Sequence, residues 1–217
     1  MNDTNTQFPL AAPGGPFETT EELVRGVKMP VFKQRPKSAR EVLIDSAKFG
    51  DKDYLVKGNQ RITYAQVIPM VASVAAGLKS EHGIGKGDRV AILAANYPEW
   101  IVTFWAVTSL GGVVIALNAW WVKDEIEYAL AHSAPKLLFV DQRRRDITDI
   151  IDHGIVTLDI QADLEVLAAH KPEAELPTVR IEEDDPAVML YTSGTTGRPK
   201  GALLPHRAII GFMQVQA

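Results

Sequence analysis

The sequence lacks cysteine altogether, and this absence excludes disulfides, thiolate catalysis and metal sites built on cysteine. It also lacks any pair of histidines with the spacing of metal ligands, since its histidines lie far apart in the chain. The first residues contain neither the basic patch nor the apolar run of a secretory signal. A net charge of −4 gives no reason to expect nucleic acid or an anionic membrane as partner. We therefore expect a cytoplasmic protein.

One long apolar stretch needs a separate explanation. Residues 100–122 contain no charged side chain and are long enough to span a bilayer. They are interrupted by Gly111-Gly112 and include several hydroxyl and amide side chains. A buried helix followed by a buried strand accounts for the stretch better, so we predict no transmembrane segment.

The first forty residues contain five prolines, which disfavour long regular elements and predict an extended lead-in. A short amphipathic helix within 36–50 and a hairpin of 54–57 with 61–63 are expected next. Thr63-x-x-Gln66 has the pattern of a capping box and should open a helix that continues to Leu78. Pro69 lies inside that pattern and predicts either a kink or a later start of the helix.

From residue 89 onward, short strands rich in Val, Ile and Leu alternate with helices. Strands are expected at 89–94, 113–117, 137–140 and 155–158, with helices from Pro98 to Gly111, at 124–132, at 144–153 and through 164–170. This β-α-β-α-β-α-β order predicts an α/β fold, a parallel sheet with helices on both faces.

Two polar segments suggest how the chain is divided. Residues 171–177 form a proline-bearing connector, and residues 182–185 form an acidic run. We place a boundary there, which gives an extended lead-in (1–40), an α/β parallel-sheet lobe (41–177) and the start of a second lobe (178–217).

A segment rich in glycine and hydroxyl groups follows the buried strand 187–191. Its glycines let successive backbone N–H groups turn inward, its hydroxyls add donors, and its lysine supplies a point charge. That mixture suits a polyphosphate, although composition alone favours a solvated turn of ordinary turn residues. A Walker A loop is excluded because Pro199 stands five residues after Gly194. Residues 201–205 look extended, so the segment should join strand to strand. It reads Thr192-Ser193-Gly194-Thr195-Thr196-Gly197-Arg198-Pro199-Lys200-Gly201.

The order of these residues decides between the two interpretations. Tyr191 to Gly201 resembles, residue for residue, the phosphate-loop signature of the adenylate-forming superfamily, which includes acyl-CoA synthetases, peptide-synthetase adenylation domains and luciferases. The resemblance extends upstream to about Arg40. Three segments are similar to bacterial fatty-acyl-CoA synthetases in particular: Pro16-Phe17-Glu18, Asn96-Tyr97-Pro98-Glu99-Trp100 and Asn118-Ala119-Trp120-Trp121.

The resemblance implies a two-step ligation, in which a carboxylate attacks Mg-ATP and coenzyme A then displaces AMP from the acyl-adenylate. The loop from Thr192 to Lys200 would cradle the β- and γ-phosphates. Ser193, Thr195 and Thr196 would donate through hydroxyls, Gly194 and Gly197 through the backbone, and Arg198 and Pro199 complete the loop. Lys200 would stabilise the departing pyrophosphate. His206 matches a family histidine beside the acyl and adenylate region; the alternative is a polar residue leading into a helix at 207–215.

The resemblance also implies parts beyond this sequence, since members of the family are several times a typical domain in length. We therefore expect the 217 residues alone to be inactive, and expect exposed apolar surface to favour a homodimer. Two alternatives stay open. One is a catalytically dead binding or scaffolding module, and the other is an adenylating enzyme with an acceptor other than coenzyme A.

Two further groups of residues are assigned simpler roles. Arg143, Arg144 and Arg145 are expected to form a solvated helix start instead of a phosphate clamp, because charge runs usually face water. The four tryptophans are expected in the core instead of an acyl pocket, because large aromatic side chains dominate core burial. They are Trp100, Trp105, Trp120 and Trp121.

Overall fold

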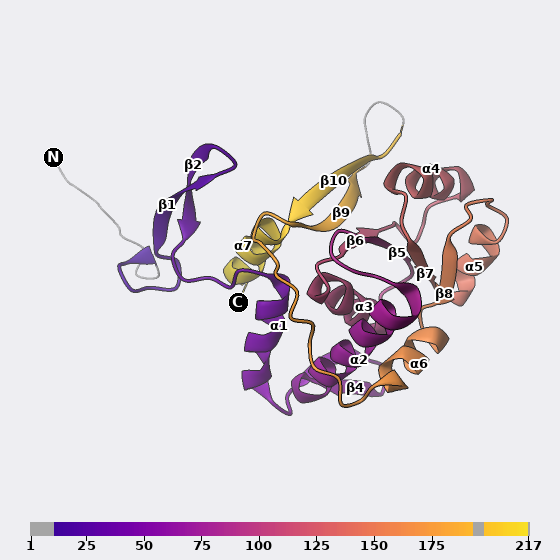
Figure 1. The fold of residues 1–217 in the computed structure, drawn as a ribbon, viewed down its shortest axis with the longest axis horizontal. Coiled ribbons are helices and arrows are strands. Elements are labelled where there is room, and N and C mark those ends of the chain that lie inside the picture. The colour runs from indigo at the N-terminus through magenta and orange to yellow at the C-terminus, as the bar shows by residue number, and fades with distance from the viewer. Residues whose placement is uncertain (1–10, 193–197, 217) are drawn as a thin grey trace.

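The computed structural model describes residues 11–192 and 198–216, and it is built around one six-stranded sheet (Figure 1). The strand order is β10-β9-β6-β5-β7-β8, and all neighbouring pairs are parallel except β9 with β10. The predicted α/β fold with a parallel sheet is therefore confirmed. The strands are β5 (Arg89–Leu93), β6 (Val113–Ala116), β7 (Leu137–Val140), β8 (Val156–Asp159), β9 (Pro186–Thr192) and β10 (Lys200–Pro205).

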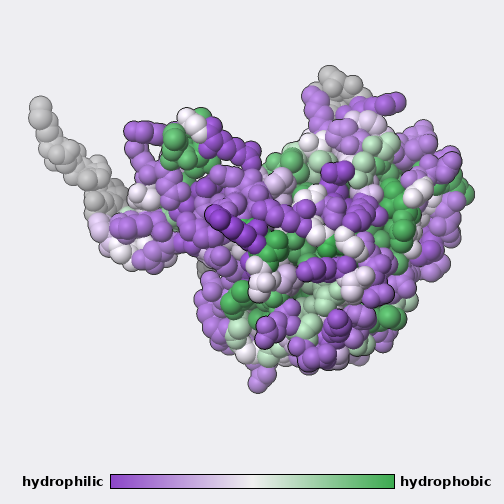
Figure 2. Space-filling model, in the orientation of Figure 1, coloured by the Kyte–Doolittle hydropathy of each residue, from purple (hydrophilic) through white to green (hydrophobic). Residues whose placement is uncertain are grey.

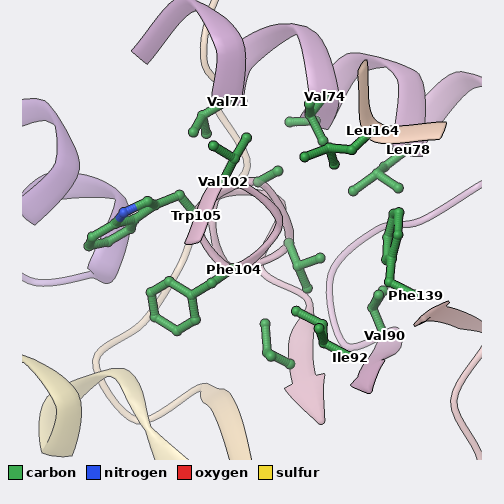
Figure 3. Close-up of a cluster of buried hydrophobic side chains, with 14 of the residues drawn as sticks. Val71, Val74, Leu78, Val90, Ile92, Val102, Phe104, Trp105, Phe139 and Leu164 are labelled. Atoms are coloured by element: carbon green, nitrogen blue, oxygen red, sulfur yellow. The ribbon is translucent and has the colours of Figure 1, made fainter. Parts of the chain in front are cut away.

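Helices cover both faces of this sheet. On one face lie α2 (Tyr64–His82), α3 (Pro98–Ser109) and α6 (Ala162–His170), and on the other lie α4 (Lys123–Ser133) and α5 (Gln142–Thr148). Successive side chains of β5 point to opposite faces of the sheet and so contribute to two separate cores. Val90 and Ile92 pack toward α2 and α3, whereas Ala91 and Leu93 pack toward α4. Figure 3 shows the first of these two cores, in which side chains of α2, α3 and α6 meet those of β5 and β7.

The helix boundaries follow local capping chemistry. Thr63 and Gln66 form the predicted capping box, and α2 begins directly after it at Tyr64. Pro69 lies inside the continuous helix, so the alternative of a later start is wrong. Asp141 caps α5 by accepting a hydrogen bond from the backbone N–H of Arg144 (3.0 Å), which places this helix earlier than the predicted 144–153.

The lead-in contains more regular structure than its prolines suggested. Strands β1 (Thr19–Val24) and β2 (Val27–Phe32) form an antiparallel hairpin across a turn at Arg25 and Gly26, both with positive φ. Positive φ at both central residues matches the right-handed twist of a tight hairpin. Pro30 is tolerated because the hairpin is two-stranded, so each strand is an edge strand.

The remaining elements lie between this hairpin and α2 in sequence, except for α7, which follows β10. Figure 2 shows a largely hydrophilic surface with apolar patches, one of them on the hairpin, where Leu23 and Val27 are exposed. The elements are α1 (Ala39–Asp45), the 3₁₀ helix η2 (Ser46–Phe49), β3 (Asp53–Lys57), β4 (Gln60–Thr63) and α7 (His206–Gln216). Within the described residues, no helix is both long enough and apolar enough to cross a bilayer.

An ion-pair network attaches the hairpin to the acidic run at 182–185. The side chain of Arg35 is almost fully buried and bridges Glu22 (2.7 Å) and Glu183 (2.9 Å). Arg207 also pairs with Glu183. The acidic run therefore has a structural role in this fold. Strand β9 begins just after it and pairs with β6, so both sides of the predicted lobe boundary contribute to one sheet, and the division into lobes stays a prediction.

Candidate functional site

The described ends of the predicted phosphate loop, Thr192 and Lys200, lie at the carboxyl edge of the parallel sheet. Because β9 runs parallel to β6 and β6 parallel to β5, the ends of β5, β6, β7 and β9 meet at this edge (Figure 1). Open α/β sheets bind their ligands in the crevice outside the carboxyl ends of the strands. The two ends of the loop therefore lie at the edge where folds of this class bind ligands.

The two stems of the loop pair directly with each other. Thr192 is opposite Lys200 in the antiparallel β9–β10 register, and the Thr192 hydroxyl lies 3.5 Å from the backbone oxygen of Lys200. The predicted strand-to-strand connection is confirmed. Thr192, Arg198 and Lys200 are exposed, whereas Pro199 is buried. The predicted donors Ser193, Gly194, Thr195, Thr196 and Gly197 lie outside the described residues.

The two faces of the β9–β10 hairpin have different surroundings. Tyr191 is paired with Gly201 on the face toward α4, so the next pair, Thr192 with Lys200, lies on the opposite face. A Cβ atom at Gly201 would lie 2.8 Å from Sδ of Met189 and 3.4 Å from Cε1 of His132. Glycine at 201 therefore allows α4 to cross close over the base of the loop.

Tyr191 fixes the strand that enters the loop. Its hydroxyl donates to the backbone oxygen of Ala129 (3.2 Å) and lies 2.9 Å from Nδ1 of His132. Its ring meets Trp121 edge-on, with 5.5 Å between centroids. Burial raises the pKa of the Tyr191 hydroxyl, which keeps it a neutral donor at physiological pH.

A buried ion pair joins the loops that follow the three central parallel strands. Asp141, after β7, accepts from the backbone N–H of Ala95, after β5, and pairs with Arg144 at 2.7 Å. Arg144 also donates to the backbone oxygen of Ala119, after β6. The prediction of a wholly solvated arginine run is therefore wrong for Arg144, because a neighbouring carboxylate and a carbonyl compensate its burial.

The tryptophans are divided between the core and the surface. Trp105 is 5% exposed and donates to the Tyr54 hydroxyl (2.8 Å), and Trp100 and Trp121 pack against the two cores, as predicted. Trp120 contradicts the prediction, because it is 77% exposed. Its ring lies 5.6 Å from the guanidinium of Arg143, at the side of a hollow of about 370 Å³ beside the carboxyl edge.

His206 lies at the far end of the hairpin from Lys200. It follows β10, whose six residues span roughly 20 Å at the usual rise of an extended strand. The imidazole is fully buried, and Nδ1 accepts the backbone N–H of Ala39 at 3.1 Å, which leaves the proton on Nε2. Burial, with smaller contributions from Arg40 and Lys86, lowers its pKa to about 4. The structure therefore does not bring His206 and Lys200 together.

The arrangement of the stems suits an anionic ligand. Lys200 and Arg198 supply two exposed cations and Thr192 an exposed hydroxyl, all at one end of one hairpin. The described ranges contain no cluster of three metal-ligating side chains. Sequence reasoning missed Tyr128 and His132, whose i,i+4 spacing on a helix next to the loop was the only signal available for them.

Comparison with known proteins relates this geometry to a family. The profile of a family described as AMP-binding enzyme matches residues 44–217. The chain is 33% identical over 149 residues to a feruloyl-CoA synthase from Amycolatopsis sp, covering 69% of this chain and 29% of that protein. It is 27% identical over 217 residues to a long-chain-fatty-acid–CoA ligase from Bacillus subtilis (strain 168), covering 83% and 39%. It thus spans well under half the length of either relative.

Solved structures agree in fold. The N-terminal domain of FACL13 from Mycobacterium tuberculosis has a TM-score of 0.70 at 27% identity, covering 79% of this chain and 45% of that one. The crystal structure of VinN has a TM-score of 0.72 at 24% identity, covering 83% and 49%. Because the family profile matches most of the sequence, from residue 44 onward, this chain belongs to the AMP-binding enzyme family.

Proposed function

We propose that the protein carrying this sequence is an ATP-dependent acyl-CoA ligase. A carboxylate oxygen attacks the α-phosphorus of Mg-ATP, and the bond to pyrophosphate breaks. The sulfur of coenzyme A then attacks the acyl carbon of the acyl-adenylate, which forms the thioester and releases AMP. Membership of the family supports this proposal, as do relatives named as feruloyl-CoA synthase, long-chain-fatty-acid–CoA ligase and 4-coumarate–CoA ligase. The observation that carries it is the pairing of Thr192 with Lys200 at the carboxyl edge of the sheet.

In this proposal the loop binds the β- and γ-phosphates of ATP. Lys200 places its ammonium beside the charge that develops on the departing pyrophosphate, and the Thr192 hydroxyl donates to a neighbouring phosphate oxygen. Ser193, Thr195 and Thr196 are assigned the same donor role through their hydroxyls, and Gly194 and Gly197 through their backbone N–H groups. Arg198 adds a second cation, and buried Pro199 holds the chain between the two cations.

The acyl substrate can be proposed from likeness in sequence. The relatives are named for feruloyl, fatty-acyl, coumaroyl and hydroxybenzoyl substrates. We propose a fatty acid, on the likeness of residues 16–18, 96–100 and 118–121 to fatty-acyl-CoA synthetases. Thioester formation from a panel of fatty acids, ferulate, 4-coumarate and 3-hydroxybenzoate tests it, and a clear preference for an aromatic acid would overturn it.

The test of the phosphate site is ATP–pyrophosphate exchange, measured on the protein that carries this sequence. Lys200→Ala should lower the exchange rate roughly 100- to 1000-fold, the usual loss when one preorganised charge-stabilising group is removed. Lys79→Ala is the matched control, because Lys79 is an exposed lysine of α2, far along the chain from the loop. Undiminished exchange after Lys200→Ala would overturn the assignment. Exchange without thioester formation would indicate a different acceptor.

A further inference from the structure

The helix α4 contacts both stems of the phosphate loop through a column of aromatic rings. Tyr128 and His132 lie four residues apart on this helix, and their rings stack with 5.6 Å between centroids and an interplanar angle of 21°. His132 meets the ring of Tyr191 edge-on at 5.8 Å. On the other side of the loop, the guanidinium of Arg198 lies 5.1 Å from the centre of the Tyr128 ring.

The two ends of the column hold their stems differently. At the entering stem, Tyr191 is fixed by the backbone oxygen of Ala129, by His132 and by Trp121. At the leaving stem, exposed Arg198 contacts Tyr128 through a cation–π interaction. Stacking uses the flat face of a guanidinium and leaves its N–H donors free in the plane. Arg198 can therefore rest on the ring and still bind phosphate oxygens.

We propose that Tyr128 is a positioning residue for ATP, acting through Arg198. Its ring holds the guanidinium on the α4 side of the β9–β10 hairpin, whereas the register places Lys200 on the opposite face. Arg198 and Lys200 thus lie on different faces of the hairpin and can approach a polyphosphate from two directions. A guanidinium already stacked on a ring also loses less side-chain entropy when phosphate binds. This inference rests on the phosphate-binding role proposed above.

The neighbouring rings explain why Tyr128 can fulfil this role. His132 stacks on Tyr128 and lies within hydrogen-bond distance of Tyr191, so the orientation of the Tyr128 ring depends on the position of the entering stem. The entering and leaving stems are therefore coupled through three rings from two elements. A chain with a flexible aliphatic side chain at 128 would keep the helix but lose this coupling.

A double-mutant cycle on the KM for ATP in pyrophosphate exchange tests the proposal. Tyr128→Leu should raise KM about two- to fivefold, the range of an exposed cation–π contact, with kcat within twofold of the unmodified protein. Tyr128→Phe keeps the ring and should restore the original KM. The variant carrying both Tyr128→Leu and Arg198→Ala should be no worse than Arg198→Ala alone. Glu127→Gln, an exposed neighbour on α4, is the control.

Two results would overturn the inference. If the effects of Tyr128→Leu and Arg198→Ala multiply, the two residues act independently. If Tyr128→Phe is as impaired as Tyr128→Leu, the hydroxyl and not the ring matters. Lys200→Ala distinguishes failure of this inference from failure of the phosphate site. If Lys200→Ala loses exchange but the effects of Tyr128→Leu and Arg198→Ala multiply, only the role of Tyr128 is rejected. Exchange retained in Lys200→Ala rejects the phosphate site itself.

Discussion

His206 should make the folded chain lose stability as the pH falls below 6.5. The imidazole is fully buried, its Nδ1 already accepts the Ala39 N–H, and its Nε2 has no hydrogen-bond partner among the described residues. Protonation would place a second hydrogen against the Ala39 N–H and a charge in the interior. These features explain why its pKa falls from 6.5 to about 4.

The sign of the effect follows from proton binding in the two states. Between pH 6.5 and 4 the unfolded chain binds a proton at His206 and the folded chain does not, so stability falls with the pH. The contribution is fully present above pH 6.5, the unfolded value, and is lost progressively toward pH 4. At pH 5 the loss from this one residue amounts to about 2 kcal/mol, a large part of the stability of a typical domain.

Urea unfolding at pH 7 and pH 5, followed by tryptophan fluorescence, measures this loss. His206→Gln is the comparison, because its side-chain oxygen can accept the Ala39 N–H and does not titrate. The unmodified chain should lose about 2 kcal/mol more than the variant between the two pH values. Ion pairing lowers the pKa of Glu183 and of Asp185, so these carboxylates titrate at more acidic pH, and both proteins share them. Equal losses in the two proteins would refute the reasoning, as would an NMR titration of His206 with its midpoint near 6.5.

Two further predictions concern packing. Gly201→Ala should lower the free energy of unfolding by about 1–3 kcal/mol because the new methyl group meets Met189, and Met189→Ala in the same chain should recover part of that loss. Gly211→Ala should not destabilise α7, because no atom lies within 4 Å of the new methyl group. The denaturant midpoints of the three variants test these expectations. Trp105→Ala should lower the free energy of unfolding by about 3–5 kcal/mol and Trp120→Ala by less than about 0.5 kcal/mol, because Trp105 is buried and Trp120 is exposed. Equal decreases in the melting temperature of the two variants would show that side-chain exposure does not determine the loss.

The elements that the sequence predicted well are those specified by neighbouring residues. Residues within a few positions of one another specify three of these features: the Thr63–Gln66 capping box, Pro98 at the start of α3 and the short apolar strands. The errors concern residues whose environment depends on distant chain. Arg144 is buried against the backbone oxygen of Ala119, twenty-five residues away, as well as against neighbouring Asp141, and a rule about charge runs does not include the distant partner. To predict the β1–β2 hairpin, the turn signal of Arg25-Gly26 would have had to count for more than the prolines around it.

The candidate site was predictable to the same extent. The prediction that the loop joins strand to strand already implied that Lys200 and His206 lie far apart. An extended strand of six residues separates them along its whole length. Lys200 begins β10 and His206 directly follows it, so the two predicted catalytic residues are separated by the length of that strand. The hydrogen bond from the Ala39 N–H to His206 supports a role of this histidine in attaching α1 to the segment that follows β10. The contacts that α4 makes with the loop go instead to Tyr191 and Arg198. No rule based on neighbouring residues connects the aromatic side chains of this helix to a loop so far away in sequence.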